Sequence, residues 1–97
     1  MNKKQVLIEK IRNLLYEVEK AKNIVDEDKF IYLDNYAKSI ERIMNKVEEE
    51  SLPPSQGGVM GTMRGISEYD SLASIKSLYD AACDVDLYYS NECKTWK

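Results

Sequence analysis

Apolar residues recur at steps of three and four in three segments of this chain, the spacing that places side chains along one side of an α-helix. The segments are 3–25, 28–50 and 68–95. Their apolar stripes are Leu7, Ile11, Leu14, Val18, Ala21 and Val25; then Phe30, Leu33, Tyr36, Ala37, Ile40, Met44 and Val47; and finally Ile75, Leu78, Ala82, Val85, Tyr89 and Trp96. No segment shows convincing strand alternation. The sequence therefore predicts an all-α fold, an antiparallel bundle of three long helices in a single domain over 1–97.

The connections refine this prediction. Asp26 to Asp28 form a short acidic link that suits a turn and the start of a helix, so the first two helices should pack as a hairpin. Glu48 to Glu50 carry the wrong charge for a helix C-terminus, so this end either frays or faces a basic partner. The third segment either continues or breaks near Ser90, which would leave a short fourth helix from Glu92.

A long Pro/Gly-rich loop is predicted over 51–66, before the last long helix. Two prolines stop the preceding helix, and four glycines permit unusual backbone angles. The apolar loop residues either plug one end of the bundle or belong to an ordered binding loop that carries Arg64; they are Val59, Met60, Met63 and Ile66. A phosphate-binding P-loop is excluded because no strand precedes the glycines and no lysine follows them. Either Ser67, with Asp70 in a capping-box spacing, or Ser71 begins the next helix.

Catalytic and metal chemistry has little support in this composition. The chain has no histidine, which removes the commonest general base and the commonest zinc ligand. Cys83 and Cys93 would lie about 15 Å apart on one helix, so we expect two free thiols. Asp80 and Asp84 could share a divalent ion, but they lack inward-facing partners on other helices. We therefore predict no enzyme, no cofactor and no metal site.

Charge and hydropathy limit the partners and the compartment. The net charge is −3, which argues against nucleic-acid and anionic-membrane binding because both need a basic surface. No apolar run follows the basic first residues as in a secretory signal, and no stretch approaches the roughly 18 apolar residues of a membrane span. We therefore expect a cytoplasmic protein.

Acidic residues are concentrated in the last segment. Residues 66–93 hold six acidic side chains and one basic one, Lys76. The side of the last helix opposite its apolar stripe mixes aspartates with Tyr, Leu and Asn, the composition expected where a helix meets a basic protein. With Arg64 from the loop, the candidate partner-binding residues are Tyr69, Asp80, Asp84, Asp86, Leu87, Tyr88 and Asn91.

Two alternatives apply to this surface. The loop over 51–66 could cover Leu87 and Tyr88, which would leave the aspartates at the rim of a buried helix. Asp86 lies nearer the margin of the core than Asp80 and Asp84, so it could instead accept a hydrogen bond from Arg64 or Tyr79 and hold the loop.

Two stretches come closest to a signature: RGISEYDSL at Arg64–Leu72 and DLYYSNEC at Asp86–Cys93. With its small size, helical character and acidic surface, the chain resembles the small immunity proteins of bacterial toxin–immunity systems. That resemblance implies one-to-one binding of a basic cognate protein, a toxin domain and often a nuclease, whose active site or substrate surface is blocked. No diagnostic motif of one such family is matched, so the resemblance assigns no residue.

A second class of function stays open, a non-catalytic assembly or regulatory module. A homodimer could form through Leu15, Ile31 or the loop methionines. Pairing two copies through Asp80 and Asp84 would place like charges together, which disfavours that surface for self-association.

Overall fold

The structure, a computed structural model, describes residues 2–49 and 61–93. Every regular element in these two stretches is a helix, and there are five. They are α1 (Lys3–Lys22), α2 (Glu27–Glu48), α3 (Thr62–Ser67), α4 (Asp70–Ala73) and α5 (Lys76–Glu92). The prediction of an all-α fold is thus confirmed for the part of the chain that the structure describes.

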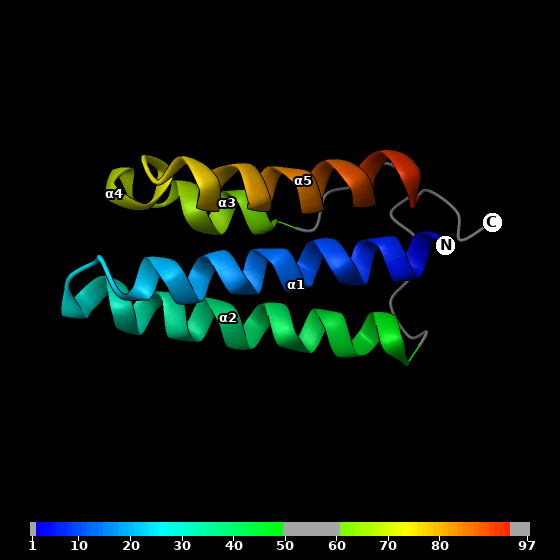
Figure 1. The fold of residues 1–97 in the computed structure, drawn as a ribbon, viewed down its shortest axis with the longest axis horizontal. Coiled ribbons are helices and arrows are strands. Elements are labelled where there is room, and N and C mark those ends of the chain that lie inside the picture. Colours follow the sequence, from blue (N-terminus) through cyan, green and yellow to red (C-terminus); the bar gives the residue numbers. More distant parts are fainter. Residues whose placement is uncertain (1, 50–60, 94–97) are drawn as a thin grey trace.

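Helix α1 lies between α2 and α5 and runs antiparallel to both (Figure 1). Helices α3 and α4 lie beside α5, toward the end of the molecule at which the chain turns from α1 into α2. None of the helices in residues 2–49 and 61–93 is both long and apolar enough to cross a membrane.

The hairpin of α1 and α2 forms much as the apolar spacing predicts. Leu7, Ile11, Leu14 and Val18 are fully buried along one side of α1. The Asn2 side chain caps α1 by accepting a bond from Gln5 N at 2.8 Å. Asp26 caps α2 in the same way, because its carboxylate accepts from Lys29 N at 2.9 Å. The helices differ from the predicted spans 3–25 and 28–50 by only a few residues at each end.

The predicted helix over 68–95 is wrong in its first part. The chain turns at Tyr69 and again at Ile75, whose backbones are extended (φ −126°, ψ 128° and φ −80°, ψ 94°). The long helix therefore begins only at Lys76. Neither predicted N-cap serves that role, since Ser67 ends α3 and Ser71 lies inside α4.

The predicted loop over 51–66 is also wrong in its last part, because α3 starts at Thr62. Ile66 is fully buried and joins the main core, while Met63 keeps 36% of its surface exposed. The rest of that loop, the C-terminal end of the predicted last helix with Trp96, and most of a fourth helix from Glu92 lie outside the described residues.

Candidate functional site

Four of the eight candidate binding residues, Asp80, Asp84, Leu87 and Asn91, are exposed on α5. Leu87 is 60% exposed, and Asn91 is exposed one turn further on. The side chains of Asp80 and Asp84 are 59% and 52% exposed. We call this surface the α5 outer face, and it consists of Lys76, Asp80, Asp84, Leu87 and Asn91. Its one apolar residue, Leu87, is thus accessible and lies between the carboxylate of Asp84 and the amide of Asn91.

Both aspartates of the α5 outer face already have a lysine partner. Lys76 Nζ lies 3.1 Å from Asp80 Oδ2, one turn away on the same helix. Lys10 Nζ reaches across from α1 to both oxygens of Asp84, at 3.0 and 2.9 Å. The same ammonium lies 5.3 Å from the centre of the Tyr88 ring, so Tyr88 is partly covered. Exposed ion pairs of this kind contribute only about 0–1 kcal/mol, so a partner's basic side chains can replace these lysines.

Asp86 must be removed from the binding set, because it is only 3% exposed and points into the protein. Its carboxylate caps α3, accepting from Thr62 N and from Met63 N at 3.0 Å each. The Thr62 hydroxyl also donates to this carboxylate and lies 2.9 Å from the carbonyl oxygen of Ala82. Asp86 therefore holds the start of α3 in place, as the alternative interpretation proposed. The groups that donate hydrogen bonds to its carboxylate belong to Thr62 and Met63 rather than to Arg64 or Tyr79.

Two tyrosines of α2 hold the other side of the same short helix. Tyr36 OH donates to the carbonyl of Thr62 at 2.7 Å, and Tyr32 OH donates to the carbonyl of Gly65 at 2.5 Å. A Cβ at Gly65 would lie 2.6 Å from Tyr36 Cε1, so glycine is required for this close approach. Burial raises the pKa of Tyr36 well above its ordinary value. We call residues 62–73, which comprise α3 and α4, the clip.

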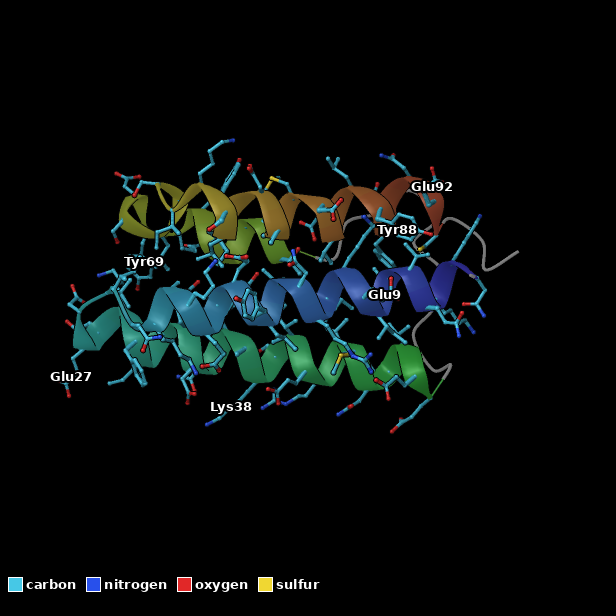
Figure 2. The ribbon with its side chains drawn as sticks, in the orientation of Figure 1. Glu9, Glu27, Lys38, Tyr69, Tyr88 and Glu92 are labelled. Atoms are coloured by element: carbon cyan, nitrogen blue, oxygen red, sulfur yellow. The ribbon has the colours of Figure 1, made fainter. Side chains whose placement is uncertain are left out.

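The structure places Tyr69 away from the centre of the α5 outer face, and Arg64 on another helix, α3. Tyr69 lies toward the opposite end of the molecule from Tyr88 (Figure 2). It packs edge-on against Tyr32 at 4.9 Å between ring centres, and Lys29 Nζ lies 4.6 Å from the centre of its ring. Arg64 is exposed on α3 and forms no ion pair with the residues that the structure describes. The accessible core of the site is therefore Asp80, Asp84, Leu87 and Asn91.

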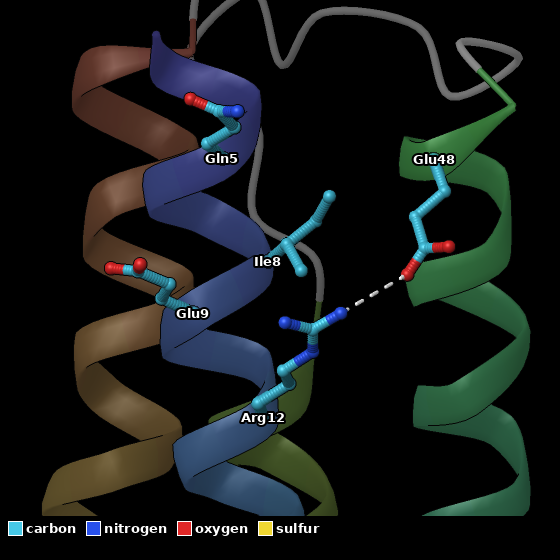
Figure 3. A pocket seen from close by; sticks show the side chains of 5 residues that line it. All are labelled: Gln5, Ile8, Glu9, Arg12 and Glu48. Atoms are coloured by element: carbon cyan, nitrogen blue, oxygen red, sulfur yellow. Dashed lines mark ion pairs between the residues drawn. The ribbon is translucent and has the colours of Figure 1, made fainter. Parts of the chain in front are cut away.

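A groove between α1 and α2 lies away from this surface (Figure 3). It encloses about 510 Å³ and is lined by Gln5, Ile8, Glu9, Arg12 and Glu48. Arg12 Nη2 stands 3.9 Å from Glu48 Oε1 across its mouth, and both side chains are largely exposed. A loose, exposed ion pair of this kind does not hold a ligand rigidly, so the groove is a weaker candidate than the α5 outer face.

No arrangement for nucleophilic or metal catalysis appears in residues 2–49 and 61–93. No three cysteine, aspartate or glutamate side chains in these stretches gather closely enough to hold a metal ion. The one strongly buried carboxylate described above, that of Asp86, is occupied by backbone and hydroxyl donors.

Comparison with known proteins adds no family. No family model, no curated protein and no solved structure matches this chain.

Proposed function

We propose that the chain is a protein-binding inhibitor whose α5 outer face docks on a basic cognate protein and neutralises it. The single observation that supports this proposal is Leu87, which is 60% exposed on a helix whose other side is packed in the core. On the same face the carboxylate of Asp84 precedes it and the amide of Asn91 follows it. An accessible apolar residue surrounded by polar groups is the composition of a protein interface, in which a desolvated centre is sealed by a polar rim.

The charge of the face fits a basic partner. Asp80 and Asp84 are spaced by about one helical turn, or about 6 Å along the axis. Their lysine partners are on the surface, so lysines and arginines of the partner can replace them at small cost. Complementary charge would speed association, while Leu87 would supply the contact that slows dissociation.

The proposed mechanism is steric and electrostatic. The carboxylates occupy a cationic surface of the partner that normally receives phosphate groups or another acidic substrate. Bound in this way, the helix excludes the substrate without any chemical step. An immunity protein that blocks a bacterial toxin, a nuclease included, is the form of this function that the general resemblance favours.

The test is affinity capture from a lysate of the native cell at low and moderate salt. The baits are the wild type, Leu87→Ser, and the double variant Asp80→Lys with Asp84→Lys. A matched control carries Glu41→Lys, on α2, with Glu49→Lys, at its C-cap, and both residues are exposed. Helix α1 separates α2 from α5 (Figure 1). We expect one basic protein on the wild type and on the control, and its loss from the other two baits. Equal capture by all four baits would show that the α5 outer face is not the interface.

A second candidate is a homodimeric assembly module. Apolar side chains are exposed around the turn between α1 and α2, namely Ile24, Phe30 and Ile31. Leu15, by contrast, packs against the core and is a poor dimer contact. Size-exclusion chromatography with light scattering separates the two functions: a monomer fits the one-to-one inhibitor, and a dimer that Ile31→Lys dissociates fits the assembly module.

A further inference from the structure

Two sulfur atoms from different helices meet beside the α5 outer face. The Cys83 thiol of α5 lies 3.0 Å from Met63 Sδ of α3, close enough for the S–H group to donate to the thioether. Met63 is 36% exposed and Cys83 is partly exposed, so the pair is accessible from solvent. Cys93 is fully buried and offers no such access.

The packing of α3 on α5 brings the two residues together. Asp86 accepts a hydrogen bond from Met63 N and so fixes the first turn of α3 against α5. Cys83 lies almost one turn before Asp86, on the part of α5 that α3 covers. The thiol is therefore not alone, since the buried carboxylate fixes the backbone of Met63 next to it and the thioether lies in contact with it.

We propose that Met63 and Cys83 form a two-donor binding site for Cu(I). Thiolate and thioether sulfurs are soft ligands that select this ion, which accepts few ligands. Zinc and calcium are poor fits because they need more donors than the described residues bring together. On binding, the Cys83 thiol releases its proton to solvent, each sulfur donates an electron pair, and the copper stays monovalent.

The site lies among paired charges. Asp80 lies about one turn before Cys83 and Asp84 follows it directly, and each carboxylate is already paired with a lysine, so the binding of the ion depends on the two sulfurs. Leu87 lies one turn beyond Cys83 and supplies an apolar neighbour. The two sulfurs must move apart to admit the ion, and Met63 can do so because it is partly exposed and has three rotatable side-chain bonds.

The test is anaerobic titration of the purified full-length chain with Cu(I), in competition with a chromogenic Cu(I) chelator. Met63→Leu removes the thioether and keeps the side-chain volume. Met44→Leu, on α2 and packed against the core, is the matched control that loses a thioether elsewhere. Cys83→Ser removes the thiolate. Circular dichroism checks that each variant keeps its helix content.

We expect the wild type and Met44→Leu to bind one equivalent with equal affinity. Met63→Leu should bind roughly tenfold or more weakly, at least the loss that follows when a supporting partner of a metal ligand is removed. Cys83→Ser should bind none at this site. Equal affinity of the wild type and Met63→Leu would mean a lone thiol and overturn the proposal. Absence of Cu(I) uptake by the wild type, or its persistence in Cys83→Ser, would overturn it as well.

Discussion

The α1–α2 hairpin and the clip are held in place by different interactions. The hairpin rests mainly on a continuous stripe of buried aliphatic side chains. Its polar contacts are the caps at its helix starts and exposed or partly buried ion pairs between α1 and α2, such as Lys22 with Asp34 at 2.9 Å. The clip has two buried apolar anchors, Ile66 and Leu72, and its position depends on polar groups from two other helices. Apolar burial is non-directional and tolerant, whereas these hydrogen bonds specify one register. The hairpin therefore supplies most of the stability, and the hydrogen bonds of the clip determine where α3 and α4 lie.

Leu14→Ala should cause the largest loss of stability and should affect the whole molecule. Leu14 is fully buried in the middle of α1, between α2 and α5. Removing a buried leucine typically costs about 2–5 kcal/mol, because transfer free energy is lost and a cavity remains. Chemical denaturation monitored by circular dichroism measures this loss in the free energy of unfolding. A loss below that of the clip variants would contradict the division between the two regions.

Asp86→Ala should cost about 1–3 kcal/mol and act locally, because it leaves the buried amide of Thr62 without its acceptor. Hydrogen exchange should show faster exchange in residues 62–73 while α1 and α2 keep their protection. Asp84→Ala is the matched control on the same helix and should cost at most about 1 kcal/mol, since its ion pair is exposed. Equal effects of the two variants would remove the structural role of Asp86.

Gly65→Ala should be destabilising although Gly65 lies in a helix. The added Cβ would stand 2.6 Å from Tyr36 Cε1, and overpacking of this kind costs about 1–3 kcal/mol. Better helix propensity offsets about 1 kcal/mol of that cost. The double variant Gly65→Ala with Tyr36→Ala should show less than the sum of the two single losses in a thermodynamic cycle. Strict additivity would show that the two residues do not interact.

Tyr36→Phe should have the smallest effect at neutral pH, about 0.5–1.5 kcal/mol for one lost hydrogen bond. At alkaline pH the ionisation of Tyr36 makes the free energy of unfolding depend on pH. Burial raises the pKa of Tyr36 in the folded protein, so above the ordinary value of 10.0 the folded chain keeps a proton that the unfolded chain has released. Stability should therefore fall as pH rises past that value, and fall less steeply in Tyr36→Phe. Parallel pH profiles between pH 9 and 11 would contradict this role.

The sequence predicts the hairpin well and the clip poorly, for physical reasons. A period of 3.6 residues is a local property, so the spacing of Leu7, Ile11 and Leu14 is enough to place α1. The turns at Tyr69 and Ile75 involve no proline or glycine at those positions. The bond between Thr62 N and Asp86 requires the chain to turn back between these residues, which are 24 positions apart, and periodicity cannot reveal such a pairing.

The sequence also predicts part of the positions of the candidate binding residues. Helical spacing correctly places Asp80, Asp84, Leu87 and Asn91 on the exposed side of α5. It also indicated that Asp86 lies near the core margin, but it could not supply the donors that bury it. Lys10 was missed as the partner of Asp84, because nothing in the local sequence connects α1 with α5. Met63 was missed as the neighbour of Cys83 for the same reason.

We propose that Asp80 and Asp84 bind a partner, whereas Asp86 stabilises the fold. The most direct measurement is the association rate of the captured basic protein with the wild type and with Asp80→Lys/Asp84→Lys, over a series of salt concentrations. We predict at least about tenfold slower association of the variant at low salt, a weaker salt dependence and a loss of at most about 1–2 kcal/mol in the free energy of unfolding, because the two ion pairs that it breaks are exposed. Equal association rates and equal salt dependence for the two proteins would contradict the claim.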